Sequence, residues 1–189
     1  MKKIFLSFVF VLFSMASFAQ NTWSVDPMHS SVNFTIKHMG INFVQGRFDK
    51  FRGTIMAKGA SLENAKFDMA VDSESINTGV EMRDKHLKSD DFLAAGKFPA
   101  ITLDGTSISK DKNGSYTLNG RLTIKEVKKE ISVPVTFGGV TKNKEGKEIM
   151  GIQAKFTINR LDYDIKYDPT GTGIAKDVEI AAYFELVKQ

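Results

Sequence analysis

Three histidines, His29, His38 and His86, are the side chains of this sequence best suited to act as a catalytic base or a metal ligand. None stands in a known catalytic or metal-binding spacing. The chain has no His-Glu-x-x-His, no Gly-x-Ser-x-Gly, no phosphate-binding loop and no dinucleotide fingerprint. A metal site would need His29 and His38 together with a carboxylate such as Asp26 or Asp84. The simpler interpretation is that both histidines donate hydrogen bonds to backbone carbonyls at strand ends.

Other reactive groups are equally sparse. The chain has no cysteine, which excludes disulfides and thiolate metal sites. Asp90 and Asp91 are adjacent and Asp162 and Asp164 are two apart, and carboxylates in such positions usually face solvent. No basic stripe accompanies the aromatic residues, so no nucleic-acid partner is expected. We therefore predict a protein that is not an enzyme and has no catalytic residue, metal or cofactor; the alternative is a hydrolase or metal-dependent enzyme that uses one of the three histidines.

One helical segment is predicted around residues 79 to 93, because Thr78 and Glu81 form a capping box ahead of good helix formers. Basic side chains gather on this segment, namely Arg83, Lys85, His86 and Lys88. Two interpretations remain open for them. They can complement the helix dipole, or Arg83 and His86 can hold an anionic head group at the mouth of a cavity.

Apolar and polar residues alternate almost everywhere else, which is typical of strands with one buried face. The clearest apolar runs are Val32, Phe34, Ile36; Phe67, Met69, Val71; Ile131, Val133, Val135, Phe137; Ile152, Ala154, Phe156, Ile158; and Val178, Ile180, Ala182, Phe184, Leu186. The pattern predicts an all-β fold with one helix.

The turns between these runs predict antiparallel neighbours. Asn113-Gly114 is a strong hairpin signal, and Gly138-Gly139 and Glu145-Gly146 are expected to bracket a loop. Pro134 removes a backbone donor from a strand, so we expect a bulge or an incomplete seam there.

About eight strands of this kind can close as a barrel or pair as a sandwich. Continuous apolar faces with small residues at Gly120, Ala154 and Ala182 favour a barrel with a lumen, because small inward residues leave space. The same residues also fit a tapered, filled core, and the pattern alone does not choose between the two.

The N-terminus has the pattern of a secretory leader. Lys2 and Lys3 precede an apolar run that is too short and too diluted by serine to span a bilayer, and Ala19 ends a small-residue cleavage site. We predict cleavage after Ala19, a periplasmic or secreted location and no stable membrane anchor. Removal of the two lysines lowers the formal charge from +4 to +2, so net charge indicates no particular partner. The remaining 170 residues (20–189) suit one globular domain.

Several motifs resemble one family. Trp23-Ser-Val-Asp-Pro-Met-His-Ser30 opens the mature chain, Arg83-Asp-Lys-His-Leu-Lys-Ser-Asp-Asp-Phe92 and Lys97-Phe-Pro99 lie in its middle, and Asn159-Arg-Leu-Asp-Tyr163 lies near its end. With Phe34-Thr-Ile-Lys-His38, Gly46-Arg-Phe48 and Leu118-Asn-Gly-Arg-Leu-Thr-Ile124, these resemble the YceI-like, polyisoprenoid-binding family across nearly the whole mature chain.

After the leader at 1–19, the resemblance implies an eight-stranded antiparallel, lipocalin-like β-barrel with an apolar lumen over 20–189, to which the residue pattern adds one short helical segment. It implies an exported protein that carries or sequesters a long-chain isoprenoid or similar lipid and has no enzymatic activity; a homodimer is left open. The inward runs then predict the lumen wall: Phe34, Ile36, Phe67, Met69, Ile101, Leu103, Leu118, Leu122, Val135, Phe137, Phe156, Ile158, Ile180 and Phe184. Arg83 and His86 become the head-group candidates.

Overall fold

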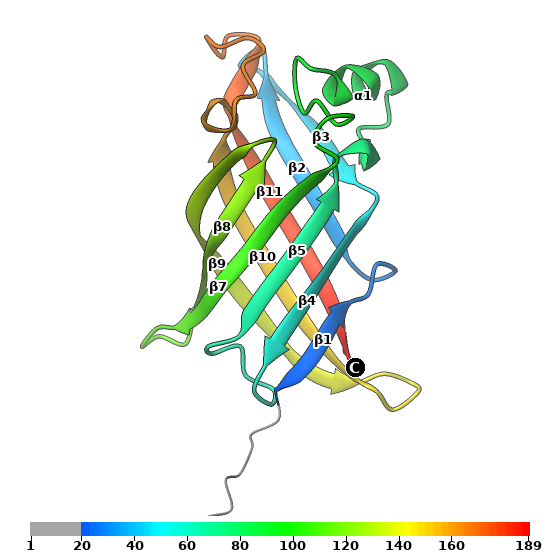
Figure 1. The fold of residues 1–189 in the computed structure, drawn as a ribbon, viewed down its shortest axis with the longest axis vertical. Coiled ribbons are helices and arrows are strands. Elements are labelled where there is room, and N and C mark those ends of the chain that lie inside the picture. The colour runs from blue at the N-terminus through cyan, green and yellow to red at the C-terminus, as the bar shows by residue number, and fades with distance from the viewer. Residues whose placement is uncertain (1–19) are drawn as a thin grey trace, which may run out of the picture.

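The computed structural model describes residues 20–189, and the predicted leader lies outside them. The strands are β1 (Asn21–Val25), β2 (Ser31–His38), β3 (Asn42–Phe48), β4 (Phe51–Ala57), β5 (Lys66–Asp72), β6 (Ile76–Asn77), β7 (Ala100–Lys110), β8 (Tyr116–Ile124), β9 (Val127–Lys142), β10 (Glu148–Asn159) and β11 (Ile174–Lys188). The helices are α1 (Glu81–Lys88) and two 3₁₀ turns, Ser73–Ser75 and Arg160–Tyr163. Figure 1 shows the strands wrapped into an elongated barrel with α1 at one end.

The strands form one antiparallel sheet that closes on itself, because β1 pairs with β11 as well as with β4. Around the ring, β4 is followed by β5, β7, β8, β9, β10 and β11. The C-terminal end of β11 pairs with β1, and the rest of β11 pairs with β2. On its other side β1 pairs with β4, and β2 pairs with β3. Residues 20–189 therefore make a barrel with eight strand positions, two of them interrupted, which confirms the predicted fold class.

The interruption between β1 and β2 falls at Pro27, which has no N–H for the ladder. On one side of it the Asp26 N–H donates to the Glu185 carbonyl at 2.8 Å. On the other side the Glu185 N–H donates to the Ser30 hydroxyl at 3.0 Å. Because both groups bond to β11, the wall stays closed across the break.

The seam between β9 and β10 is incomplete, as Pro134 predicts. Their pairing ends at Val135 and Ala154, although β9 begins at Val127 and β10 runs on to Asn159. Charged side chains join the two sides beyond that point, with Lys129 Nζ 3.2 Å from an Asp162 carboxylate oxygen. The barrel wall is thus held there by side chains rather than by a backbone ladder.

The hairpins follow the predicted turn chemistry with one correction. Gly114 takes φ +87° between β7 and β8, and Gly146 takes φ +79° between β9 and β10. Gly138 and Gly139, expected at the start of a loop, instead lie inside β9 at a bulge, where the register to β10 shifts. Strand β9 therefore continues to Lys142 before it turns.

The capping box predicted for the helix is wrong. Helix α1 begins at Glu81 after Val80, and no side chain caps it. The Thr78 hydroxyl and the Thr78 N–H both donate to the Asp84 carboxylate, and the threonine oxygen does not accept from a backbone N–H of the helix. The helix is also shorter than expected, and none of its residues is buried.

The interior has a packed end and a hollow end. Seven buried side chains fill the end where β1, the β4–β5 loop and the C-terminal part of β11 meet: Trp23, Ala57, Leu62, Ala65, Tyr116, Met150 and Leu186. The hollow end lies on the α1 side of the barrel. The two interpretations of the sequence, a lumen and a filled core, thus each describe part of the molecule.

Gly120 does not leave room in the lumen, contrary to expectation. It pairs with Gly105 across β7 and β8, and a Cβ at Gly120 would lie 2.6 Å from the Asp104 carbonyl oxygen. The glycine therefore permits close approach of two strands at a bulge.

Candidate functional site

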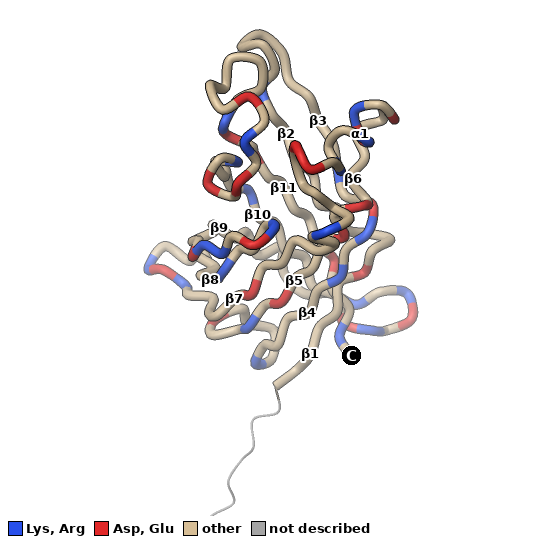
Figure 2. The backbone as a smooth tube through the Cα atoms, turned by 45° about the horizontal axis from the view of Figure 1, so that its top comes forward, with Lys and Arg blue, Asp and Glu red and all other residues tan. Residues whose placement is uncertain are grey.

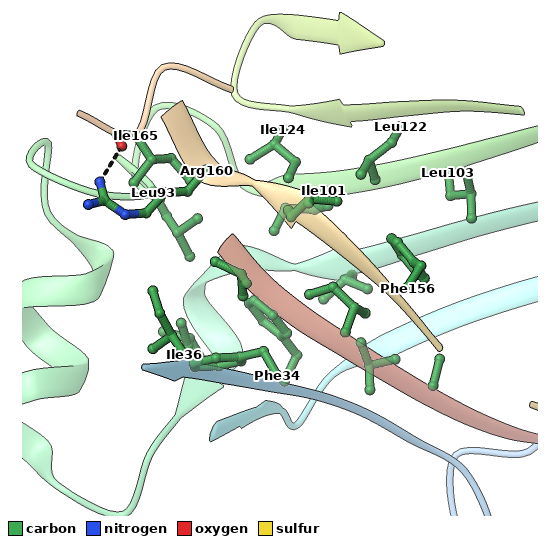
Figure 3. Close-up of a pocket in the computed structure, with 18 of the residues that line it drawn as sticks. Phe34, Ile36, Leu93, Ile101, Leu103, Leu122, Ile124, Phe156, Arg160 and Ile165 are labelled. Carbon is green, nitrogen blue, oxygen red and sulfur yellow. Dashed lines mark hydrogen bonds between the residues drawn. The ribbon is translucent and has the colours of Figure 1, made fainter. Parts of the chain in front are cut away.

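An apolar cavity of about 890 Å³ occupies the hollow end of the barrel. Val80 and Met82 line it and are themselves exposed, so the cavity opens to solvent beside α1. We call this opening the mouth. Figure 3 shows Phe34 and Ile36 on one side and Leu122, Ile124 and Phe156 on the other, around the same space. The volume and lining are typical of a site for an apolar small molecule.

Polar lining groups are confined to the mouth. They are His38 and Asn42 at the β2–β3 hairpin, Arg83 and His86 on α1, Thr102 near the start of β7, and Arg160 and Tyr167 after β10. The remaining lining residues are apolar, and the far end is closed by the packed side chains around Trp23. The cavity can therefore accept a long apolar chain inward and a polar group only at the mouth.

The sequence predicted most of the wall. Of the fourteen wall residues predicted, all but Phe137 line the cavity. Phe137 faces inward but belongs to the packed end, where its ring lies edge-on to Tyr116 with centroids 6.0 Å apart. Alternation along a strand predicts which face a residue occupies, whereas its depth in the barrel depends on the register with other strands.

Helix α1 supplies the two head-group candidates, and both line the mouth. The Arg83 guanidinium donates through Nε to the Thr78 hydroxyl at 2.8 Å and through Nη2 to the Thr78 carbonyl at 3.1 Å. The His86 ring makes edge contacts with Phe92 and Tyr167, with centroids 4.9 and 5.0 Å apart, and its Nε2 lies 3.0 Å from an Asp91 carboxylate oxygen. Both side chains are therefore positioned by neighbours at the rim.

Arg160 is a site residue that sequence reasoning missed. It is 2% exposed, and its five N–H donors meet five backbone carbonyls. The acceptors are Ala175 for Nε, Ile165 and Tyr167 for Nη1, and Asp168 and Ile174 for Nη2. Burial lowers the pKa of the guanidinium, and the Asp168 charge opposes that shift. Arg160 thus ties the segment between β10 and β11 to the mouth (Figure 3).

Asp168 completes this segment, which we call the mouth loop (residues 160–173). Its carboxylate accepts from the Thr170 hydroxyl at 2.7 Å and from the N–H groups of Gly173 and Ile174 at 2.8 Å each. These bonds, that of Thr170 first, lower the pKa of Asp168 to about 2. At neutral pH the carboxylate is therefore ionised and holds the loop closed on itself.

The three histidines do not come together at one site. His38 and His86 both line the mouth, whereas His29 precedes β2 and His38 ends it, so β2 alone separates these two by more than about 20 Å at about 3.3 Å per residue. The metal arrangement that would combine them is therefore not formed. The expected bond from His29 to a backbone carbonyl is also wrong, because His29 Nδ1 lies 2.8 Å from Asp26 Oδ2.

Among residues 20–189, Asp26, His29 and Glu185 are grouped closely enough to approach one ion. The His29 side chain is 66% exposed, and its hydrogen bond to Asp26 raises the pKa of the imidazole. The group lies at the break between β1 and β2, on the outside of the wall and away from the cavity lining. Its evident role is to brace that break.

Comparison with known proteins agrees with this architecture. Residues 23–186 match the model of the YceI-like domain. A UPF0312 protein of Vibrio parahaemolyticus is 30% identical over 85% of this chain and 83% of its own. The crystal structure of the Campylobacter jejuni YceI protein superposes with a TM-score of 0.73 at 32% identity, covering 81% of this chain and 90% of that one.

A polyisoprenoid binding domain from Saccharophagus degradans shares the fold at 16% identity, with a TM-score of 0.68 over 88% of this chain and 98% of its own. The barrel, its hollow end and the match along 23–186 point to the same conclusion as the sequence motifs. The chain belongs to the YceI-like family.

Proposed function

We propose that the protein binds the tail of a long-chain isoprenoid, or of a similar amphiphile, in the lumen and carries or sequesters it. The observation that carries this proposal is the apolar cavity of about 890 Å³, closed at one end and polar only at its mouth. The structural neighbour from Saccharophagus degradans, described as a polyisoprenoid binding domain, supports the isoprenoid class.

The energetics suit this ligand. Each buried methylene contributes about 0.8 kcal/mol, so a tail of several isoprene units supplies ample binding free energy without any specific contact. Selectivity then depends on chain length and on the polar rim. Arg83 and His86 are the groups proposed to contact a head group, whereas the N–H donors of Arg160 are already used by backbone carbonyls.

Mass spectrometry of an organic extract of the denatured, purified protein tests the proposal. We expect a long-chain lipid near one equivalent per chain. Extracts without lipid, together with no uptake of a polyprenyl alcohol from detergent micelles, would contradict it. One equivalent of zinc that is lost in His29→Ala would instead favour the metal-dependent alternative.

We further propose that the protein is exported after removal of residues 1–19, on the basis of the leader pattern. The intact mass of the exported protein is expected to begin at Gln20. Retention of Met1 in that fraction would disprove processing. No helix within residues 20–189 is long and apolar enough to cross a bilayer.

A further inference from the structure

Exposed apolar side chains gather around the mouth. In residues 20–189 eight large hydrophobic side chains are well exposed, and six belong to the segments that surround the mouth: Met39, Ile41, Phe43, Val80, Met82 and Tyr167. We call these six residues the mouth rim. Ile41 is 88% exposed and Met82 is 82% exposed. Isolated apolar residues on a surface are ordinary, but a group of six around one opening marks an interaction surface.

The tip of the β2–β3 hairpin keeps apolar residues where turn chemistry disfavours them. Met39 takes φ +50°, a left-handed conformation that favours Asn or Gly, and Ile41 follows two residues later. The nine residues from His38 to Gly46 contain no Lys, Arg, Asp or Glu, as the tan tip of this hairpin in Figure 2 shows. Exposure of this tip to water is therefore unfavourable, and contact with an apolar partner would bury its side chains.

The mouth rim is continuous with the lumen. Val80, Met82 and Tyr167 belong to the rim and also line the cavity. A hydrocarbon tail that enters over these side chains remains in contact with apolar surface along its whole path. Since exposure of a tail to water is costly, such a path favours direct exchange with a lipid phase.

Charges near the mouth are mixed in sign. On α1, Glu81 and Asp84 offset much of the charge of Arg83, Lys85 and Lys88. Lys37 Nζ lies 6.0 Å from the centre of the Phe43 ring, which places a cation next to the apolar tip. An amphipathic surface of this kind fits the boundary between head groups and acyl chains, and its affinity should depend little on net lipid charge.

We propose that the mouth rim docks the protein on a lipid bilayer, with Ile41, Phe43 and Met82 inserted at the boundary of the acyl chains and the lumen open toward the membrane. This inference rests on the proposed function, because docking serves to pass a lipid tail between the bilayer and the lumen. It adds to the lumen an adjoining docking surface, one that acts before any ligand is bound.

Flotation of the purified, lipid-stripped protein with phosphatidylcholine vesicles tests docking directly. We expect the protein to float with the vesicles at both low and high salt. Ile41→Asp and Met82→Asp are each expected to weaken partitioning by roughly tenfold or more, because each removes an apolar side chain from the inserted set. Met28→Asp is the matched control, since Met28 is 84% exposed but lies at the break between β1 and β2; it should float like the wild type.

A second measurement separates docking from lumen binding. Uptake of a polyprenyl alcohol from detergent micelles needs the lumen but no bilayer, so Ile41→Asp should match the wild type there and be slower only when vesicles are the donor. Absence of wild-type flotation, or equal flotation of all variants, would overturn docking. A dimer that Ile41→Asp dissociates, without vesicle binding, would overturn it in favour of a second copy of the chain. Normal flotation without uptake from micelles would refute the lumen function and leave docking intact.

Discussion

Arg160 acts as a cross-link within the mouth loop rather than as a ligand-binding cation. Its planar guanidinium directs five N–H groups to carbonyls on both sides of the loop. Lysine has three donors on a flexible stem and cannot reach the same set. A change at this residue should therefore alter the stability of the fold and the order of the mouth loop together.

We predict that Arg160→Lys lowers the free energy of unfolding by about 3 kcal/mol, because buried carbonyls lose their donors. The urea midpoint of the ligand-free protein measures this. The control is Arg47→Lys, whose side chain is 61% exposed and pairs with Asp49 on the surface. That change should cost less than about 1 kcal/mol. Equal effects of the two substitutions would contradict the structural role of Arg160.

The stability of the mouth loop depends on pH through Asp168. Its pKa of about 2 in the folded chain is lower than the ordinary value of 3.8. The ionised carboxylate therefore stabilises the loop above pH 3.8, and this contribution is lost as the pH falls from 3.8 toward 2. We predict that the amides of Gly173 and Ile174 lose protection over that range, so that their exchange becomes faster relative to the intrinsic rate at each pH. In Asp168→Asn the same amides should exchange rapidly at neutral pH and show no acid transition; an unchanged transition would contradict the assignment.

Single residues were predictable from the sequence where their role is local. Pro134 lacks a donor wherever it lies, so an incomplete seam could be expected. Arg160 could not be recognised, because its partners are backbone carbonyls five to fifteen residues away and no periodicity reports them. The available signal was an arginine directly after an alternating strand, beside Asn159, whose side chain accepts from the Leu161 N–H.

At the scale of elements, α1 is a weakly packed part of the mouth. None of its residues is buried, whereas every second residue of β8 is buried. Sequence reasoning found the helix but not its start, because Thr78 has a competing partner in Asp84 that a local pattern does not reveal. A helix with so little packing opens at a low free energy.

We predict that the amides of α1 exchange with solvent much faster than those of β7 and β8 in the ligand-free protein. Binding of a lipid should slow exchange in α1, because a tail in the mouth adds contacts to Leu87 and Met82, which line the cavity. Hydrogen exchange followed by mass spectrometry measures both states. Protection of α1 equal to that of β8 without ligand would show that the helix is not the mobile side of the mouth.

At the scale of the whole molecule, the division into a packed and a hollow end explains how one barrel is both stable and able to hold a guest. Alternation in the sequence predicted the ring and its inward faces. It could not predict the division, because depth is set by register between strands far apart in the chain. Phe137 and Val135 are two residues apart on one face of β9, yet only Val135 lines the cavity.

Four alanines provide a direct test of this division. Ala154 and Ala182 are paired across β10 and β11 and line the cavity, whereas Ala57 and Ala65 are buried in the packed end. We predict that Ala57→Phe and Ala65→Phe each cost about 1 to 3 kcal/mol by overpacking. Ala154→Phe and Ala182→Phe should change the stability of the ligand-free protein by less than about 1 kcal/mol, because the larger ring enters empty space.

The two pairs of variants should also differ in ligand uptake, measured with a polyprenyl alcohol delivered from micelles. Ala154→Phe and Ala182→Phe fill volume that the tail would occupy, so their uptake should fall while their folds persist. Ala57→Phe and Ala65→Phe should bind normally wherever they remain folded, since neither alanine lines the cavity. A large loss of stability in all four variants, with no lipid bound by the wild type, would mean that the hollow end closes in solution and that the barrel is filled throughout.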